Sequence, residues 1–475
     1  MAIGHVVSQI AWFGSLIVLA SLVPPRSFGT FTASIVVVGI AMLLMESGTR
    51  GTIVVTRRLT LTQIRTSVAI NAATGIALAS VLAAAAAPLL GEIVADGDAD
   101  VLRVLSASIV LTALSIVPLA VLQREIRFKR HSGAISAAAL GAAVVAIASA
   151  LLGAGVWALV VRQILYGALV SALAWWNVRD LLPRPDAGRA PTTLRDHRRG
   201  ASAFFVLAAA NLVALNADYV IVGNATDGRQ LGLYSLAFML GFAPLTNFSW
   251  KIGAVLFPAL SATEDRSMVV SRTLRALRLM SLALLPLVVP AVVLAPSLLP
   301  AVLGSDWEAI VLPFQILIVA GVGHALINVF GEALSGTGNI RLHAALQVLM
   351  GVAVTAVMLV LVHADGIRGA AVAHLIVLVL IAAGYVVVGG RRLGINGRAA
   401  AAAIAPVAGP VAAQAVATVL AVGVLTAAGV AEAAGALAGT LIGCAVAALV
   451  FRFSPWNAWH ETSALIRVAL HRADP

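Results

Sequence analysis

The chain has 475 residues, of which 61% are hydrophobic and only 11% are charged, and its mean hydropathy is +1.02. A soluble domain needs a far more charged surface, so this composition excludes a soluble protein, and we expect the excess apolar surface to face lipid. The net charge of +11 does not indicate nucleic acid, because the basic residues stand singly or in small groups rather than in one patch.

Apolar runs long enough to cross a bilayer fill the chain. A helix needs about 20 apolar residues to cross the hydrocarbon core, and only helices or closed barrels satisfy their backbone polar groups there. Barrel strands would alternate in polarity, whereas runs such as 83–87 and 284–294 are apolar throughout. The sequence therefore predicts an all-α integral membrane protein.

In chain order we expect about fourteen transmembrane helices. They are predicted at 5–23, 30–47, 67–90, 101–122, 133–153, 156–176, 202–224, 231–258, 276–298, 309–335, 344–362, 367–388, 404–428 and 434–451. The first run has no basic segment before it and is followed by Pro24-Pro25-Arg26, so we expect an uncleaved span rather than a signal peptide. The break between the fifth and sixth spans rests on Gly153-Ala154-Gly155, a turn signal.

The basic residues test this partition independently. If the N-terminus is cytoplasmic, the predicted cytoplasmic segments carry nearly all of them, and a missed span would invert that pattern downstream. The predicted outside loops hold only Arg26, Arg103, Arg229 and Arg368. We therefore expect an even number of spans, with both termini cytoplasmic, in the plasma (inner) membrane of a bacterium.

Short motifs recur in the same order in two parts of the chain. Phe28-Gly29-Thr30-Phe31 matches Leu231-Gly232-Leu233-Tyr234, 126–128 matches 340–342, and 155–158 matches 366–370. Such spacing predicts two pseudo-symmetric six-helix lobes, related by an axis along the membrane normal. The predicted parts are an N-terminal lobe at 1–180, a cytoplasmic Arg/Pro-rich linker at 181–200, a C-terminal lobe at 201–395, two additional helices at 396–452 and a cytoplasmic amphipathic tail at 453–475.

Enzyme and cofactor motifs are missing from the sequence. His460-Glu461 lacks the second histidine of a zinc-protease helix, because Ala464 stands there. There is no phosphate-binding loop, and the single cysteine, Cys444, can form neither a disulfide nor a thiolate metal site within one chain. We expect no cofactor and no metal, and we expect His324 and His374 to be core histidines.

Ionisable residues within the predicted spans are the candidate functional groups. A charge in the bilayer interior costs about 2.5–3.5 kcal/mol on insertion scales and marks an internal cavity. A basic group there can hold a phosphate, and a carboxylate can bind a proton or Na⁺. These residues are Glu46, Arg162, Asp218, Lys251 and Glu332.

Each candidate also has a structural interpretation. Glu46 lies near a span end and can pair with Arg50. Arg162 can extend to the outer surface, and Asp218 can hold two helices together as a buried pair. Lys251 and Glu332 can form one such pair across helices.

Several motifs resemble the oligosaccharide flippases, the Wzx-like polysaccharide transporters of the superfamily that includes MurJ and the MATE exporters. The segment 19–29, Leu-Ala-Ser-Leu-Val-Pro-Pro-Arg-Ser-Phe-Gly, is similar to the end of their first helix. Further matching segments, in an order specific to that family, are 46–48, 155–160, 216–219, 231–234, 257–261 and 336–339. The resemblance covers about 9–390, with one departure: Ser21 stands where the family usually has arginine.

This resemblance implies two six-helix lobes facing each other in a V, with alternating access. It implies a flippase that moves a polyprenyl-diphosphate-linked oligosaccharide from the inner to the outer leaflet for cell-surface polysaccharide export. The expected partners are that lipid-linked oligosaccharide, membrane lipid and other proteins of the glycan assembly pathway.

The candidate residues then take two roles in such a transporter. Arg162, Lys251 and Arg50 are expected to bind the diphosphate headgroup. Asp218, Glu46 or Glu332 is expected to carry the coupling ion. Two alternatives stay open: a MATE-like ion-coupled exporter of small amphipathic compounds, and a membrane-embedded polysaccharide polymerase or glycosyltransferase. The second is disfavoured because the predicted outside loops are short.

Overall fold

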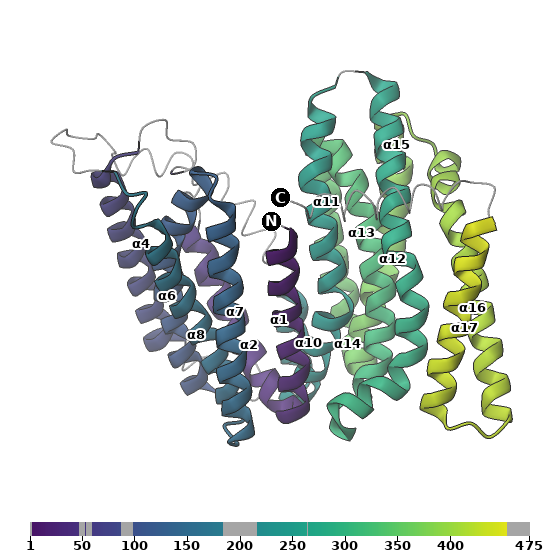
Figure 1. The fold of residues 1–475 in the computed structure, drawn as a ribbon, viewed down its shortest axis with the longest axis horizontal. Helices are drawn as coiled ribbons and strands as arrows, with labels where there is room; N and C mark the ends of the chain where they lie inside the picture. The colour runs from purple at the N-terminus through teal and green to yellow at the C-terminus, as the bar shows by residue number, and fades with distance from the viewer. Residues whose placement is uncertain are drawn as a thin grey trace. The chain divides into compact units, whose positions relative to one another are not determined.

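The computed structural model describes residues 2–46, 53, 59–86, 98–183, 216–263 and 265–453. These residues are almost entirely helical and contain no strand (Figure 1). Eleven of their helices are long and apolar enough to cross a membrane. The prediction of an all-α membrane protein is confirmed.

The chain divides into two compact units, Met1–Ser235 and Leu236–Pro475, and the boundary falls inside helix α10 (Gly228–Gly241). The predicted lobe boundaries at 180, 200 and 395 stay predictions. Most of the predicted linker and nearly all of the predicted tail lie outside the described residues, as does the first part of the predicted span 202–224.

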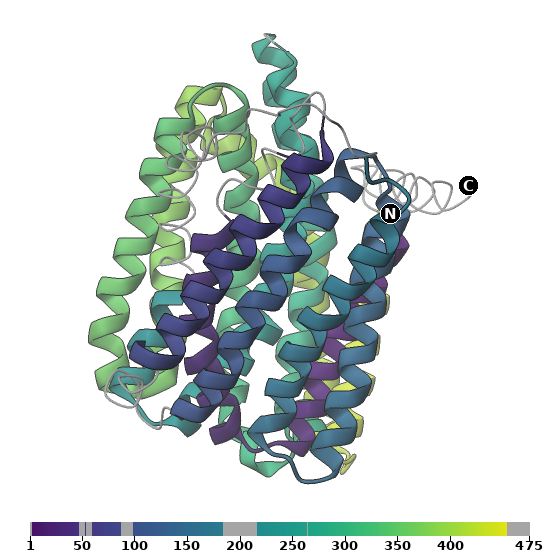
Figure 2. The same ribbon diagram turned by 90° about the vertical axis from the view of Figure 1, so that its left-hand side faces the viewer.

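The first unit is a bundle of helices that run side by side along roughly the same direction (Figure 2). Helix α8 packs on α6 and α7, α7 packs on α1, and α6 packs on α2 and α4. Helix α4 continues into the π-helical segment η1 (Leu82–Ala86). The helices are α1 (Ala2–Leu22), α2 (Pro25–Glu46), α4 (Leu61–Val81), α6 (Ala99–Arg124), α7 (Phe128–Leu151), α8 (Val156–Val178) and a helix over 216–225.

In the second unit, α13 packs against α11, α12 and α14, while α16 and α17 pair with each other and with α12 (Figure 1). The α16–α17 pair occupies the two additional predicted spans. The elements are α11 (Ala243–Ser261), α12 (Arg266–Leu303), η2 (Ser305–Ile310), α13 (Val311–Gly336), α14 (Ile340–Gly384), η3 (Tyr385–Gly389), α15 (Gly390–Leu393), α16 (Gly397–Ala427) and α17 (Glu432–Phe453).

One predicted span differs from the structure, and two other predicted spans meet at a kink within a single helical element. The predicted single span 231–258 is two helices, α10 and α11, separated at Phe242. The predicted spans 344–362 and 367–388 lie in one element, α14, which has 45 residues and is kinked at Asp365 and Gly366. A straight helix of that length would extend roughly 68 Å, about twice the hydrocarbon core, so the kink separates two crossings.

The predicted repeat between 155–158 and 366–370 has a backbone counterpart. Gly155, just before α8, has φ 55° and ψ −127°, and Gly366, at the kink of α14, has φ 52° and ψ −133°. Positive φ is strained for residues with a Cβ atom, so glycine is needed at both positions. Gly153 also has a positive φ, and the predicted break between the fifth and sixth spans is confirmed.

The repeat between 28–31 and 231–234 brings its own two glycines together, within the first unit. A Cβ atom added at Gly29 would overlap the carbonyl oxygen of Gly228, and one added at Gly232 would overlap the carbonyl oxygen of Pro25. Gly29 therefore contacts the residue four positions before Gly232, and Gly232 contacts the residue four positions before Gly29. This reciprocity is expected of two elements related by a local two-fold axis, and it brings the backbones of α2 and α10 into direct contact.

We predict that Gly29→Ala and Gly232→Ala each reduce the amount of folded protein in the membrane several-fold. The added methyl group would press on a backbone carbonyl, which cannot move aside as a side-chain end can. Detergent extraction followed by fluorescence-detected size exclusion measures this amount. Gly39→Ala, in the same helix α2 with open space around the new methyl, should behave as wild type. Equal yields of Gly29→Ala and Gly39→Ala would contradict the close crossing.

Candidate functional site

Arg162 is a buried cation in the first unit, with 5% of its surface exposed. It lies on α8, where its Nη2 donates a hydrogen bond to the carbonyl oxygen of Trp12 on α1 at 3.1 Å. Its Cζ stands 3.9 Å from the centre of the Trp12 ring, a cation–π contact. The Trp12 ring also meets Tyr166, one turn further along α8, edge to face at 6.0 Å. Arg162 therefore joins α1 to α8.

No carboxylate among the described residues pairs with Arg162. A guanidinium group carries five N–H donors, and the hydrogen bond to the Trp12 carbonyl uses only one of them. A buried arginine whose charge is balanced by a ring face and one carbonyl can still receive an anion. Its planar fork suits two phosphate oxygens at once.

Asp218 lies in the helix over 216–225 and is 3% exposed. The hydroxyl of Tyr234 donates a hydrogen bond to its Oδ2 at 3.0 Å, and the backbone N–H of Tyr219 donates to its Oδ1 at 3.0 Å. The two tyrosine rings meet edge to face at 6.0 Å. Asp218 therefore ties its helix to α10, which fits the structural interpretation and leaves the ion-coupling role a prediction.

A row of polar side chains runs along one face of α13 in the second unit. His324, Asn328 and Glu332 are spaced four residues apart and so stand one above the other. Asn328 Nδ2 donates to the Ser249 hydroxyl on α11 at 3.3 Å. The Glu332 carboxylate lies over Gly253, one turn further along α11, where a Cβ atom would stand only 2.6 Å from Oε1. The row therefore faces α11.

The hypothesis that Lys251 and Glu332 pair across helices is not supported. Lys251 is exposed, and the Glu332 carboxylate lies at Gly253, two residues further along α11. Two residues correspond to about 200° around a helix, so Lys251 and Gly253 point to opposite sides. Among the described residues, no ion pair joins Lys251 to Glu332.

The two histidines predicted for the core pack against phenylalanines. The rings of Phe242 and His324 are centred 5.4 Å apart, and those of Phe242 and His374 are centred 5.5 Å apart. His324 is buried, as predicted. Two further site candidates, Arg50 and the Glu46 side chain, lie outside the described residues.

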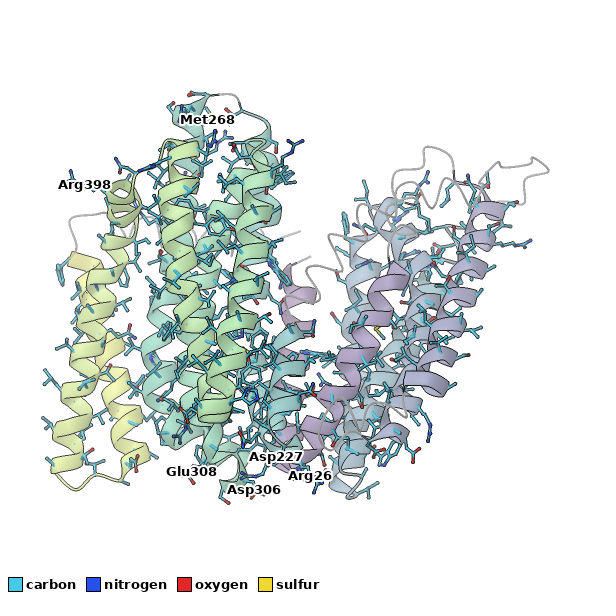
Figure 3. The ribbon with its side chains drawn as sticks, turned by 180° about the vertical axis from the view of Figure 1, so that it is seen from behind. Arg26, Asp227, Met268, Asp306, Glu308 and Arg398 are labelled. Carbon is cyan, nitrogen blue, oxygen red and sulfur yellow. The ribbon has the colours of Figure 1, made fainter. Side chains whose placement is uncertain are left out.

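Arg398 lies toward the same end of the second unit as Met268, and Asp306 and Glu308 lie at the opposite end (Figure 3). In the first unit, Arg130 at the start of α7 contacts both carboxylate oxygens of Asp180, just past α8, at 2.7 Å. This hydrogen bond lowers the pKa of the Asp180 carboxyl below its ordinary value.

The partners of the buried charges were missed by sequence reasoning. Tyr166 is four residues from Arg162 on the same predicted helix, so its proximity could have been read from helical spacing. Trp12 is 150 residues away in the chain, and no local pattern connects it to Arg162. Tyr234 was noted only as part of a repeat, not as the donor to Asp218.

Solved structures share this fold. The lipid II flippase MurJ in an inward closed conformation superposes with a TM-score of 0.74 at 12% identity, over 95% of this chain and 97% of MurJ. An inward-facing multidrug resistance MATE family transporter gives 0.61 at 16% identity, over 82% of this chain and 94% of that protein. The fold and the buried charges define a multi-pass membrane protein with the architecture of these transporters.

The sequence comparisons identify the family. The model of the family described as polysaccharide biosynthesis protein matches residues 18–312, and the chain belongs to this family. The lipopolysaccharide biosynthesis protein WzxC of Escherichia coli (strain K12) is 21% identical over 328 residues, 68% of this chain and 66% of WzxC. The teichuronic acid biosynthesis protein TuaB of Bacillus subtilis (strain 168) is 25% identical over 130 residues, 27% of each chain. The matched regions thus span less than two thirds of these relatives.

We predict that Asp218→Asn abolishes transport while the protein remains at normal abundance. Asparagine can still accept the Tyr234 hydrogen bond, so the packing survives while the negative charge is lost. Tyr234→Phe is the matched control, because it removes the hydrogen bond and keeps the charge. Wild-type transport in Asp218→Asn would end its coupling role. Equal losses of abundance in both variants would assign Asp218 a structural role only.

We predict that Arg162→Gln lowers transport at limiting substrate roughly tenfold to a hundredfold, the cost of losing one charge-assisted hydrogen bond of about 1.5–3 kcal/mol. Glutamine can still donate to the Trp12 carbonyl, so the contact between α1 and α8 is preserved. Arg103→Gln removes an arginine that is half exposed on α6 and should transport normally. Matching activities in the two variants would contradict a role for Arg162 in substrate binding.

Proposed function

We propose that the protein is a flippase that moves a polyprenyl-diphosphate-linked oligosaccharide from the inner to the outer leaflet by alternating access. Its membership of the polysaccharide biosynthesis protein family and the MurJ-like fold support this function. The observation that carries it is Arg162: a buried membrane cation, with no carboxylate partner among the described residues, is a suitable receptor for a diphosphate.

The remaining candidates complete this proposal. Lys251, exposed on α11, is a second cation for the headgroup, and Arg50 is a third. Glu332 is the carboxylate whose setting best suits ion coupling, because it is half-buried, ends the polar row of α13 and has no ion pair among the described residues. Asp218 and Glu46 are the other candidates for this role.

We further propose that the protein lies in the plasma (inner) membrane of a bacterium with both termini in the cytoplasm. The end of the second unit with Met268 and Arg398 would then face the cytoplasm, and the end with Asp306 and Glu308 would face outward (Figure 3). The lipid-linked sugar would enter from the leaflet where glycan assembly enzymes act. Other proteins of that pathway are the expected partners, and the protein itself is a transporter rather than an enzyme.

The second candidate is a MATE-like ion-coupled exporter of small amphipathic compounds, which the shared fold favours. The match to the MATE transporter covers 82% of this chain. The match to MurJ covers 95% of this chain and 97% of MurJ. The more extensive match to the lipid II flippase therefore supports the first candidate.

The test is the amount and sidedness of polyprenyl-diphosphate-linked oligosaccharide in a deletion strain, with and without a plasmid copy of the gene. We expect the lipid-linked sugar to accumulate on the cytoplasmic leaflet, and the plasmid to reverse this accumulation. Unchanged sugar with normal sidedness would overturn the flippase proposal, and a changed drug-susceptibility profile would then favour the exporter. Complete loss of the lipid-linked sugar would point instead to an assembly enzyme.

A further inference from the structure

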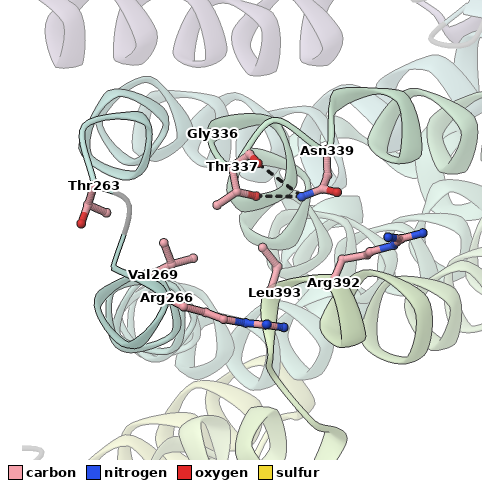
Figure 4. Close-up of a pocket in the computed structure, with 8 residues that line it drawn as sticks. All are labelled: Thr263, Arg266, Val269, Gly336, Thr337, Asn339, Arg392 and Leu393. Atoms are coloured by element: carbon pink, nitrogen blue, oxygen red, sulfur yellow. Dashed lines mark hydrogen bonds between the residues drawn. The ribbon is translucent and has the colours of Figure 1, made fainter.

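An open cavity of about 480 Å³ lies within the second unit. It is formed where α11 and α13 end and α12 and α14 begin, with α15 closing one side (Figure 4). Its polar lining consists of Arg266, Arg392, Thr263, Thr337 and Asn339. The motifs 257–261 and 336–339 noted in the sequence lie at or next to this cavity.

Neither arginine of the cavity forms a side-chain hydrogen bond within the part of the chain that the structure describes. No carboxylate lines the cavity, and neither Arg266 nor Arg392 takes part in an ion pair of the described residues. Gly394 makes room for one of them, because a Cβ atom at this residue would stand 3.0 Å from Arg266 Nε. The lining thus carries two positive charges and no negative one.

Asp265, the residue directly before Arg266, is directed toward the start of α12. Asp265 Oδ1 accepts hydrogen bonds from the backbone N–H and the hydroxyl of Ser267, both at 2.8 Å, and so caps α12. The Ser267 bonds hold the pKa of the Asp265 carboxyl below its ordinary value. Asp265 is therefore occupied as a helix cap and does not neutralise Arg266.

The start of α14 adds donors to the same cavity. Asn339 precedes α14 but makes no side-chain cap hydrogen bond to it. Its Nδ2 instead donates to the Thr337 carbonyl oxygen at 3.4 Å and to Thr337 Oγ1 at 3.3 Å (Figure 4). The first N–H groups of α14 are thereby left without a side-chain acceptor, and such groups attract anions.

We propose that this cavity binds a phosphate group. Two guanidinium groups provide charge and paired donors, Asn339 and Thr337 provide neutral polar contacts, and the uncapped end of α14 adds a favourable dipole. Arg266 of the cavity is two residues from Met268, so the cavity lies toward the end of the second unit where Met268 and Arg398 lie (Figure 3). Lipid headgroups lie at this level if this end faces the cytoplasm. The phosphate comes from an anionic phospholipid headgroup or from a soluble phosphate compound.

The experiment uses the purified full chain and measures its melting temperature with two probes: phosphatidylglycerol, with phosphatidylcholine as the zwitterionic control, and inorganic pyrophosphate. We expect phosphatidylglycerol or pyrophosphate to raise the melting temperature, and added salt to weaken the rise. A rise with pyrophosphate identifies a soluble phosphate site, and a rise with phosphatidylglycerol alone identifies a headgroup site.

Variants test whether the rise in melting temperature depends on the two arginines of the cavity. The double variant Arg266→Gln and Arg392→Gln should need at least about ten times more of the active probe for the same rise, because both guanidinium groups are lost. Arg398→Gln removes an exposed arginine of α16 outside the cavity and should respond as wild type. All three arginines are exposed, so the melting temperatures without probe should match. No rise with either probe, or equal responses of the double variant and Arg398→Gln, would overturn the proposal.

Discussion

Lipid offers no hydrogen bonds, so every backbone N–H and carbonyl within the membrane must be satisfied by the protein itself. The helices of this chain follow from that requirement. Glycines stand where the chain turns between helices and where two helices touch. Gly155 and Gly366 allow sharp turns between crossings with nearly identical dihedral angles. Gly29 and Gly232 allow two backbones to touch where side chains would keep them apart. In a medium without hydrophobic attraction between helices, such close backbone contact is a principal source of association.

The same medium penalises charge, and Arg162 and Asp218, which are buried in the described part of the first unit, each have specific partners. Arg162 lies over the Trp12 ring and donates to a carbonyl, and Asp218 accepts from Tyr234. The two residues differ in the hydrogen-bonding capacity that remains for a ligand. Arg162 retains donors for an anion, whereas Asp218 is engaged by a phenol and a backbone N–H. This difference supports a binding role for Arg162 more directly than an ion-coupling role for Asp218.

Sequence reasoning predicted the features that depend on local pattern. The apolar runs predicted the spans, and the glycines at 153 and 155 predicted a turn. The matched motifs at 155 and 366 begin with glycines of nearly equal backbone conformation. It missed features that depend on distant packing. Trp12 and Arg162 are 150 residues apart, so their contact left no periodic signal. The pairing of Lys251 with Glu332 failed because only the rotation of α11 about its axis decides which residue faces α13.

The central claim is that this chain moves a diphosphate-linked sugar lipid across a bilayer with the help of Arg162. The most direct measurement reconstitutes purified protein into liposomes containing polyprenyl-diphosphate-linked oligosaccharide and follows the fraction that an external, membrane-impermeant glycosidase can cleave. We predict that wild-type protein carries the protected lipid to the outer leaflet, where it is cleaved, and that Arg162→Gln at equal protein density does so much more slowly. A protected fraction that remains unchanged with wild-type protein, under an imposed proton or sodium gradient of either direction, would contradict the account.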